Sequence, residues 1–313
     1  MNKRVRVLVL VCCVAAAGAT ARAQNPPGTP AAAQLLEVYA AAFDDDGRPV
    51  TDLKREELEV WIGGFRVPIE RLVSVTPSAQ ERPGRLILLL LDDMTLDPAM
   101  IARARDIANR FIGRLLPGDR MGIVTLNGGA TEITDDPVRL RRQLDSFRQS
   151  LGIMPIDRIG EHLLLKVGAA ARAVAEAPEA RKRIVAIGSG WLLDTPVPPA
   201  QVNVNLREEW FDTLRALAVA NVTYHVIDPN GVGARRLASN GLAFETGGHG
   251  FTNTNDFSGA VDRILRQIDN YYVITVGDPP VGQKAALRDL DVRVLRRDVT
   301  VRTRRSIPGG GSK

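Results

Sequence analysis

The chain has 313 residues, 45% of them hydrophobic and 25% charged, with a formal net charge of +5. That length is enough for one large domain and a smaller one. Residues 1–23 hold four basic side chains and no acidic one, so the charge of +5 less these four leaves about +1. A nearly neutral chain gives no sign of nucleic-acid binding. We interpret the arginine-rich segment 288–305 as a solvated strand face, with binding of an anionic partner as the alternative.

The first residues predict a cleaved export signal. Basic residues precede an apolar run at 7–17, and Ala21-Arg22-Ala23 has the small-x-small form that signal peptidase cuts. The run is shorter than the roughly 20 residues of a membrane span, so we expect residues 1–23 to be removed and no stable span to remain; an uncleaved membrane anchor is the alternative. Both cysteines, Cys12 and Cys13, lie in this segment, which leaves the mature chain without disulfides. The sequence predicts an exported protein, either periplasmic or extracellular.

Two separated parts of the chain predict one small β unit. Residues 24–34 are rich in Pro and Ala and predict a flexible lead-in, whereas residues 35–80 contain short alternating segments separated by turns. Residues 278–306 hold two further alternating segments. We expect them to pack on the N-terminal unit as a β-sandwich, because neither piece alone has enough strands to be stable. Residues 307–313 are predicted to be a flexible tail.

Residues 84–277 alternate apolar strands with amphipathic helices. Strands are expected at 85–91, 120–126, 183–187, 222–227 and 271–276, with helices at 98–116, 137–149, 162–177, 206–220 and 256–269. Parallel strands require crossover connections, and these place helices on both faces of the sheet. The fold class predicted for this part is therefore α/β, a doubly wound and mostly parallel sheet.

The first strand of this part ends in two carboxylates. The apolar run Leu86–Leu91 leads directly into Asp92 and Asp93, and Asp97-Pro98 supplies an N-cap and a first-turn proline for the helix that follows. In open α/β sheets, ligands bind at the edge where the strands end. We therefore expect these acids to lie at the functional edge of the sheet.

The ordered set of motifs resembles a von Willebrand factor type A domain. More narrowly, it is similar to the secreted bacterial, Acidobacteria-type von Willebrand A-related proteins. The similarity covers about residues 35–306 and rests on the order of the strands together with the segments 49–60, 242–250, 271–274 and 301–305.

The resemblance raises the question of whether this chain has the side chains that bind Mg²⁺ in the family. Metal-binding members hold the ion with an Asp-x-Ser-x-Ser loop, a threonine from a second loop and an aspartate from a third, which leaves one position for an acidic residue of the partner. Mg²⁺ requires near-octahedral oxygen ligands. If Asp92 is the first aspartate here, the two serine positions hold Met94 and Leu96. The segment 157–163 contains no threonine, and Ser189 stands where the third-loop aspartate is expected.

A register shifted by one residue gives Asp93-x-Thr95-x-Asp97, which could coordinate a cation but would remove Asp97 from the helix cap. We therefore expect a degenerate metal-ion-dependent adhesion site and no resident cofactor. Its weak candidate ligands for Mg²⁺ are Asp92, Asp93, Thr95 and Ser189.

A catalytic function is not predicted. Ser189 lies between two glycines, but the nucleophile turn of hydrolases would need glycine at 187 and 191, which are Ile187 and Trp191. The three histidines lack the spacing of a zinc site, and no phosphate-binding glycine loop follows a strand. A serine hydrolase that uses Ser189 remains a third alternative.

The sequence thus predicts an exported, non-catalytic interaction protein for adhesion or scaffolding, with a protein partner. The loops at 92–97, 127–131, 157–163 and 188–197 are expected to form the interacting edge. Trp191 is a weak candidate for partner binding, since aromatic side chains are favoured at interfaces, or else it packs under its own loop. Two modes stay open: a metal-independent scaffold, and a Mg²⁺-dependent adhesion domain that binds an acidic residue.

Overall fold

The computed structural model describes residues 35–76, 84–150, 156–188, 204–233, 240–277 and 286–309. The chain divides into a unit at Met1–Ala33 and a unit at Gln34–Lys313. The predicted signal peptide at 1–23 and lead-in at 24–34 lie outside the described residues. No helix within the described ranges combines the length and the apolar character that a membrane crossing requires.

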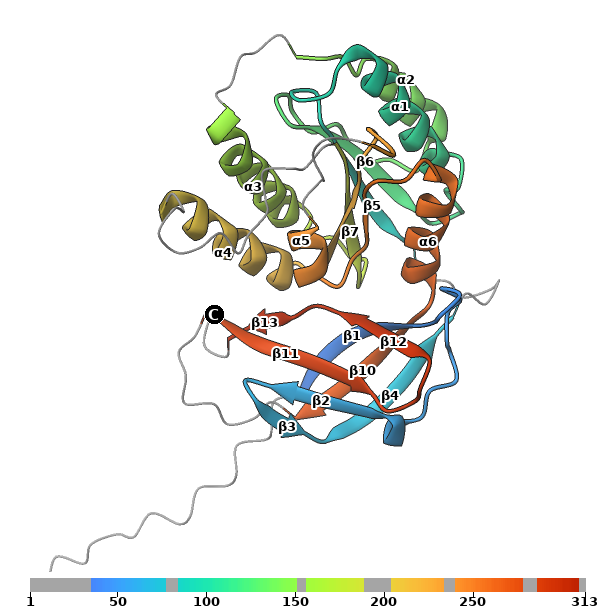
Figure 1. The fold of residues 1–313 in the computed structure, drawn as a ribbon, viewed down its shortest axis with the longest axis vertical. Helices are drawn as coiled ribbons and strands as arrows, with labels where there is room; N and C mark the ends of the chain where they lie inside the picture. Colours follow the sequence, from blue (N-terminus) through green and yellow to red (C-terminus); the bar gives the residue numbers. More distant parts are fainter. Residues whose placement is uncertain are drawn as a thin grey trace, which may run out of the picture. The chain divides into compact units, whose positions relative to one another are not determined.

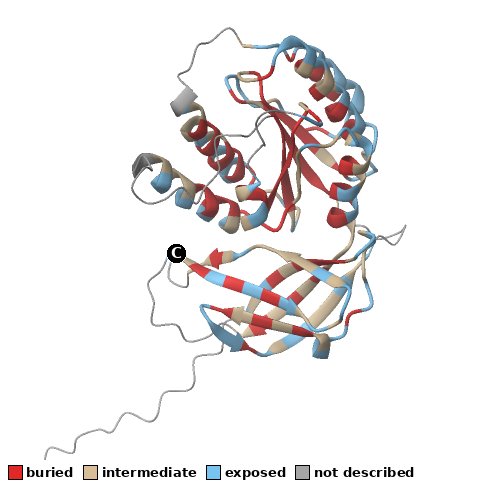
Figure 2. Cartoon of the chain, in the orientation of Figure 1, coloured by how far each residue is buried: buried red, intermediate tan, exposed pale blue. Residues whose placement is uncertain are grey.

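The central part is a parallel sheet of five strands in the order β6-β5-β7-β8-β9 (Figure 1). The strands are β5 (Leu86–Leu91), β6 (Arg120–Thr125), β7 (Lys182–Ile187), β8 (Val222–Ile227) and β9 (Gly250–Phe251). Every residue of β5, β7 and β8 is buried (Figure 2). This is the pattern of a parallel sheet covered on both faces.

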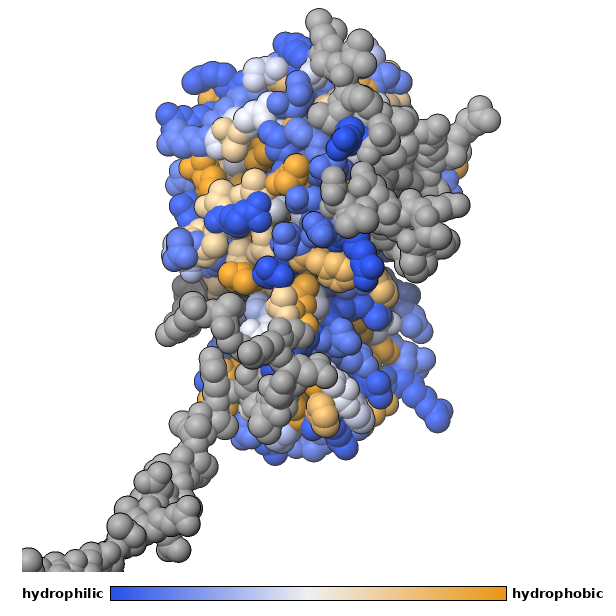
Figure 3. All heavy atoms as spheres, turned by 90° about the vertical axis from the view of Figure 1, so that its left-hand side faces the viewer, coloured by the Kyte–Doolittle hydropathy of each residue, from blue (hydrophilic) through white to orange (hydrophobic). Residues whose placement is uncertain are grey.

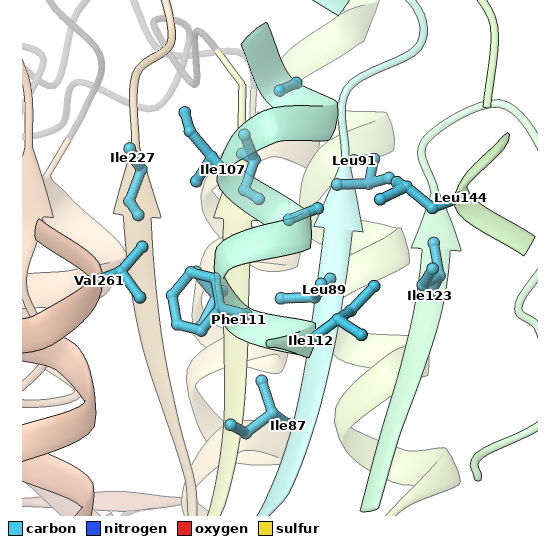
Figure 4. Close-up of a cluster of buried hydrophobic side chains, with 14 of the residues drawn as sticks. Ile87, Leu89, Leu91, Ile107, Phe111, Ile112, Ile123, Leu144, Ile227 and Val261 are labelled. Carbon is cyan, nitrogen blue, oxygen red and sulfur yellow. The ribbon is translucent and has the colours of Figure 1, made fainter. Parts of the chain in front are cut away.

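Helices cover both faces of this sheet, which confirms the predicted α/β class. The helices α1 (Pro98–Ile112), α2 (Pro137–Asp145) and α6 (Phe257–Asp269) lie on one face. The helices α3 (Ile156–Ala173), α4 (Val204–Val219) and α5 (Gly241–Glu245) lie on the other. Figure 4 shows how the first face is filled: Phe111 of α1 and Val261 of α6 point toward Leu89 and Ile227 of the sheet.

The remaining strands form two antiparallel sheets around a separate apolar core. Their orders are β12-β1-β10-β4 and β13-β11-β2-β3. Their bounds are β1 (Leu35–Asp44), β2 (Leu58–Ile62), β3 (Phe65–Val67), β4 (Ile69–Val75), β10 (Tyr271–Gly277), β11 (Leu287–Val294), β12 (Val299–Thr303) and β13 (Ser306–Pro308), with a 3-10 turn η1 at Arg55–Glu57. Buried side chains of both sheets, including Val60, Ile274 and Val292, share this core. The strand β12 pairs with β1 and β11 pairs with β2, so segments far apart in the chain build one unit.

Two expectations about these strands are corrected. The sequence assigns 271–276 to the parallel sheet, but β10 pairs antiparallel with β1 and β4. Its burial alternates, with Tyr272, Ile274 and Val276 buried and their neighbours half-buried, as in a sheet covered on one face. Residues 307 and 308, predicted to begin a flexible tail, belong to β13 because Ile307 is buried against the core of the antiparallel sheets.

Candidate functional site

The loops after β5, β6, β7 and β8 share the carboxyl edge of the parallel sheet, because parallel strands all end at the same edge. Asp92 and Asp93 follow β5, Gly188 follows β7, and Asp228 follows β8. All three aspartates are buried, with exposed fractions of 5%, 7% and 0% respectively. The edge therefore concentrates acidic groups out of water.

Asp92 is held by its own loop. Its Oδ1 accepts hydrogen bonds from the backbone N–H groups of Met94 (3.1 Å) and Thr95 (2.8 Å), and its Oδ2 accepts a short hydrogen bond from the Thr95 hydroxyl. The backbone N–H of Asp92 donates to the carbonyl of Ile187 at 3.1 Å, which fixes the start of the loop to β7. Hydrogen bonds to an ionised carboxylate are stronger than neutral ones. The loop therefore supplies hydrogen-bond donors to both oxygens of Asp92.

Asp93 connects two other loops to this edge. Its Oδ1 accepts a hydrogen bond from the backbone N–H of Asn127 at 2.8 Å, and its carbonyl accepts one from the N–H of Ser150 at 2.6 Å. The Asn127 amide also donates to the Ser150 hydroxyl at 2.5 Å. Asp93 thus holds the loop after β6 and Ser150 in place, whereas the side-chain hydrogen bonds of Asp92 stay within its own loop.

The shifted register Asp93-x-Thr95-x-Asp97 is not assembled as a ligand set. Asp97 caps α1, with its carboxylate accepting from the backbone N–H of Met100 at 2.9 Å, and Pro98 occupies the first turn. The Thr95 hydroxyl donates to Asp92. Asp93, Thr95 and Asp97 thus each form a hydrogen bond with a different partner.

Asp228 is an acidic residue of this edge that the sequence reasoning did not single out. Its Oδ1 accepts hydrogen bonds from the backbone N–H and the side-chain amide of Asn230, at 2.9 and 2.7 Å. Its Oδ2 has no partner among the described residues. Burial raises the pKa of Asp228, and the negative charge of Asp92 raises it further. An acid directly after the apolar run of β8 was the available signal.

The segment 157–163 was expected to be a loop that presents groups at this edge, but α3 begins at Ile156 and contains it. Within this segment, His162 Nε2 lies 2.6 Å from the carbonyl oxygen of Leu126, and one turn later the Lys166 ammonium donates to the carbonyl of Gly128 at 2.6 Å. These side chains anchor the loop after β6. The loop itself, at 127–130, is exposed to solvent.

Gly188 is the first residue after β7, and its lack of a side chain is required. A Cβ at this position would overlap the Cβ of Asp92. A cavity of about 20 Å³ lies beside this contact and is lined by Asp92, Leu126 and Tyr224 among others. A cavity of this size holds about one water molecule. Ser189 and Trp191, which follow Gly188, lie outside the described residues.

Among the described residues, the side chains at this edge do not fit an octahedral Mg²⁺ site. Met94 and Leu96 offer no side-chain oxygen, and both Asp92 oxygens already accept hydrogen bonds. In the part of the chain that the structure describes, no group of three His, Cys, Asp or Glu side chains is arranged to hold a metal ion. This edge therefore consists of loops that are held in place by hydrogen bonds and that contain buried aspartates.

Comparisons with known proteins give limited similarity. No family model matches the chain, and no curated protein matches its sequence. Among solved structures, proximal thread matrix protein 1 from the mussel byssus, described with a zinc-occupied MIDAS motif, is 13% identical over 65% of this chain and 50% of that chain, with a TM-score of 0.43. The PilB minor pilin from Streptococcus sanguinis is 10% identical over 62% of this chain and 64% of that chain (TM-score 0.42). The human COPII-coat protein Sec24c is 8% identical over 76% of this chain and 46% of that chain (TM-score 0.39).

The chain spans about half the length of the mussel protein that it matches. Similarity at this level assigns no function to the chain. The residues of the sheet edge, described above, remain the basis for any functional conclusion.

Proposed function

We propose that this chain is an exported, non-catalytic interaction protein whose von Willebrand A-like domain binds a protein partner without a metal ion. The observation that carries the proposal is the closed hydrogen bonding of Asp92, whose oxygens accept from Met94 and Thr95. A carboxylate satisfied in this way keeps its loop in one conformation. Preorganised loops lower the entropy cost of binding a partner.

The proposed contact surface consists of the loop after β6 and the first turn of α1. Residues 127–130 and 97–99 are exposed, whereas the residues that hold them in place are buried or bonded. A rigid support with exposed loops is the usual arrangement for binding sites on α/β domains. Elsewhere, on the side seen in Figure 3, apolar and hydrophilic side chains are interspersed.

A site-specific photocrosslinker tests this surface. We would place it at Ala99, which is exposed in the first turn of α1, and at Leu116, which is 49% exposed beyond the other end of that helix. In the producing cells, we expect a protein adduct from position 99 that EDTA does not reduce, and none from position 116. Loss of the adduct in EDTA would favour the Mg²⁺-dependent alternative instead. Equal adducts from both positions would contradict the proposed surface.

Absence of catalysis is part of the proposal and has its own test. Within the described residues, His225 is buried in β8, His249 is half-buried and donates its backbone N–H to the His225 ring, and His162 contacts a backbone carbonyl, so each histidine has a structural explanation. We expect a serine-reactive fluorophosphonate to leave Ser189 unlabelled. Stoichiometric labelling at Ser189 would establish the hydrolase alternative.

A further inference from the structure

A buried arginine near the start of β7 lacks partners for most of its donors. Arg183 is 1% exposed and lies on the sheet face that α1 and α6 cover, the face whose apolar side chains are shown in Figure 4. Its Nη1 donates to the carbonyl of Lys182 at 2.9 Å, but Nε and Nη2 find no acceptor among the described residues. A buried cation without a counter-charge strongly destabilises the folded state. The position therefore calls for a negatively charged group.

A second orphaned donor comes from the neighbouring strand. His225 of β8 pairs in register with Val185, so its side chain shares the sheet face of Arg183 two residues further along. It is 0% exposed, and its Nδ1 accepts a hydrogen bond from the backbone N–H of His249 at 3.0 Å. That bond leaves the ring proton on Nε2, which has no partner in the part of the chain that the structure describes. Burial, followed by the charge of Arg183, lowers the pKa of His225 well below its usual value, so the ring stays neutral.

Further positive charge acts on these two side chains from Arg302 in β12 and from Arg304 just after that strand. Arg302 donates to the carbonyl of Gly248 at 3.0 Å, and Arg304 donates to the side-chain oxygen of Asn221 at 3.1 Å. These acceptors are neutral, so they leave the positive charge uncompensated. The guanidinium group of Arg181, 4.4 Å from the ring centre of Tyr271, adds another cation.

The carboxylate near Arg183 already interacts with another arginine. Among the described residues, Asp269 is the carboxylate whose charge acts on Arg183, and it lies 3.4 Å from the guanidinium of Arg85. The guanidinium charges around Arg183 therefore exceed the carboxylate charge. Water molecules could satisfy the orphaned N–H groups, but they would not neutralise this excess.

We propose that a small monovalent anion, of the size of chloride, binds at the orphaned Nε and Nη2 of Arg183 and the Nε2 of His225. It would compensate the charge of the arginines and link β7 to β8 of the parallel sheet. This site lies near the strand starts, away from the loop edge at Asp92, and its existence does not depend on the proposed partner binding.

Thermal unfolding of the full chain tests the site. We would replace sodium gluconate by sodium chloride at constant ionic strength, and in a separate series by sodium sulfate. A chloride concentration about tenfold above the Kd should raise the Tm by about 2–3 °C for a chain of this size. No specific rise with chloride, or a rise with sulfate alone, would overturn the proposal.

Two buried cations provide a matched pair of variants. Arg183→Met should lose the chloride response and be at least as stable as the unaltered chain in gluconate, because it removes an uncompensated buried charge. Lys182→Met is the control, since Lys182 is buried on the opposite face and donates to the carbonyls of Ala175 and Ala220. This variant should keep the chloride response. A response that persists in Arg183→Met would place the effect elsewhere and contradict the assignment.

Anomalous diffraction from crystals of the unaltered chain grown in sodium bromide decides the question even if a variant fails to fold. We expect a bromide peak within hydrogen-bond distance of the Arg183 guanidinium and the His225 ring. Density for water alone at this position, without an anomalous signal, would overturn the proposal.

Discussion

Replacing Asp92 by alanine is the perturbation that most clearly separates a self-sufficient loop from a metal site. The substitution removes the acceptor for two backbone N–H groups and for the Thr95 hydroxyl. A hydrogen bond to a charged group contributes about 1.5–3 kcal/mol, and bonds that share one acceptor group are not additive. Met94 and Thr95 are partly exposed, so water replaces some of what is lost. We expect the free energy of unfolding to fall by about 2–4 kcal/mol.

Urea denaturation in EDTA, followed by circular dichroism, measures this loss. Asp93→Ala is the matched control, because that side chain accepts one backbone hydrogen bond, from Asn127 at 2.8 Å, and should cost about 1–2 kcal/mol. In a metal site, by contrast, removing one of several clustered carboxylates relieves repulsion when the metal is absent. An Asp92→Ala variant that equals or exceeds the unaltered chain in stability in EDTA would refute our reasoning.

Three further changes test the same edge. Gly188→Ala should destabilise by about 1–3 kcal/mol, because its Cβ would overlap that of Asp92, whereas Gly129→Ala, with open space around it, should be nearly neutral in the same urea assay. Asp97→Ala should cost about 1 kcal/mol through loss of the N-cap, and an unchanged midpoint of unfolding would contradict the capping role. Because the folded pKa of Asp228 is raised, its stabilising contribution is complete below the unfolded pKa of about 3.9 and is lost as the pH rises through the folded value. Asp228→Asn should therefore gain stability relative to the unaltered chain as the pH rises from about 4, and a parallel pH profile for the two proteins would count against a raised pKa.

The parallel sheet could be predicted because its signals are local. The strand β5 is an uninterrupted apolar run and β7 and β8 are largely apolar, a pattern that a strand buried on both faces favours. Asp97-Pro98 likewise marks the beginning of α1 by short-range chemistry. These elements depend on neighbours within a few residues, which sequence patterns capture.

The strand β10 was misplaced for the opposite reason. An apolar segment of seven residues fits either sheet, and the choice depends on pairing with β1, more than 200 residues away. The start of α3 was also predicted too late, although Pro155 directly precedes Ile156 and is a local signal for a helix start. The first error lies where the decisive contacts are distant, and the second lies where a local signal was overlooked.

In the candidate site too, local signals could be predicted from the sequence and distant contacts could not. Asp92 and Asp93 were predicted at the sheet edge from the run that precedes them, but their hydrogen-bond partners depend on how the loops meet. Asp228, Arg183 and His225 lie at the end of or inside apolar runs, where polar residues are usually structural. Their orphaned polar atoms become apparent only with the strands in register.

Isothermal titration of the folded chain with Mg²⁺ and Mn²⁺ tests the central claim most directly. Since both oxygens of Asp92 are bonded within their own loop, we expect no saturable heat at millimolar metal and no difference between the unaltered chain and Asp92→Asn. Stoichiometric binding with a micromolar Kd that Asp92→Asn abolishes would contradict the account and establish a metal-dependent adhesion site.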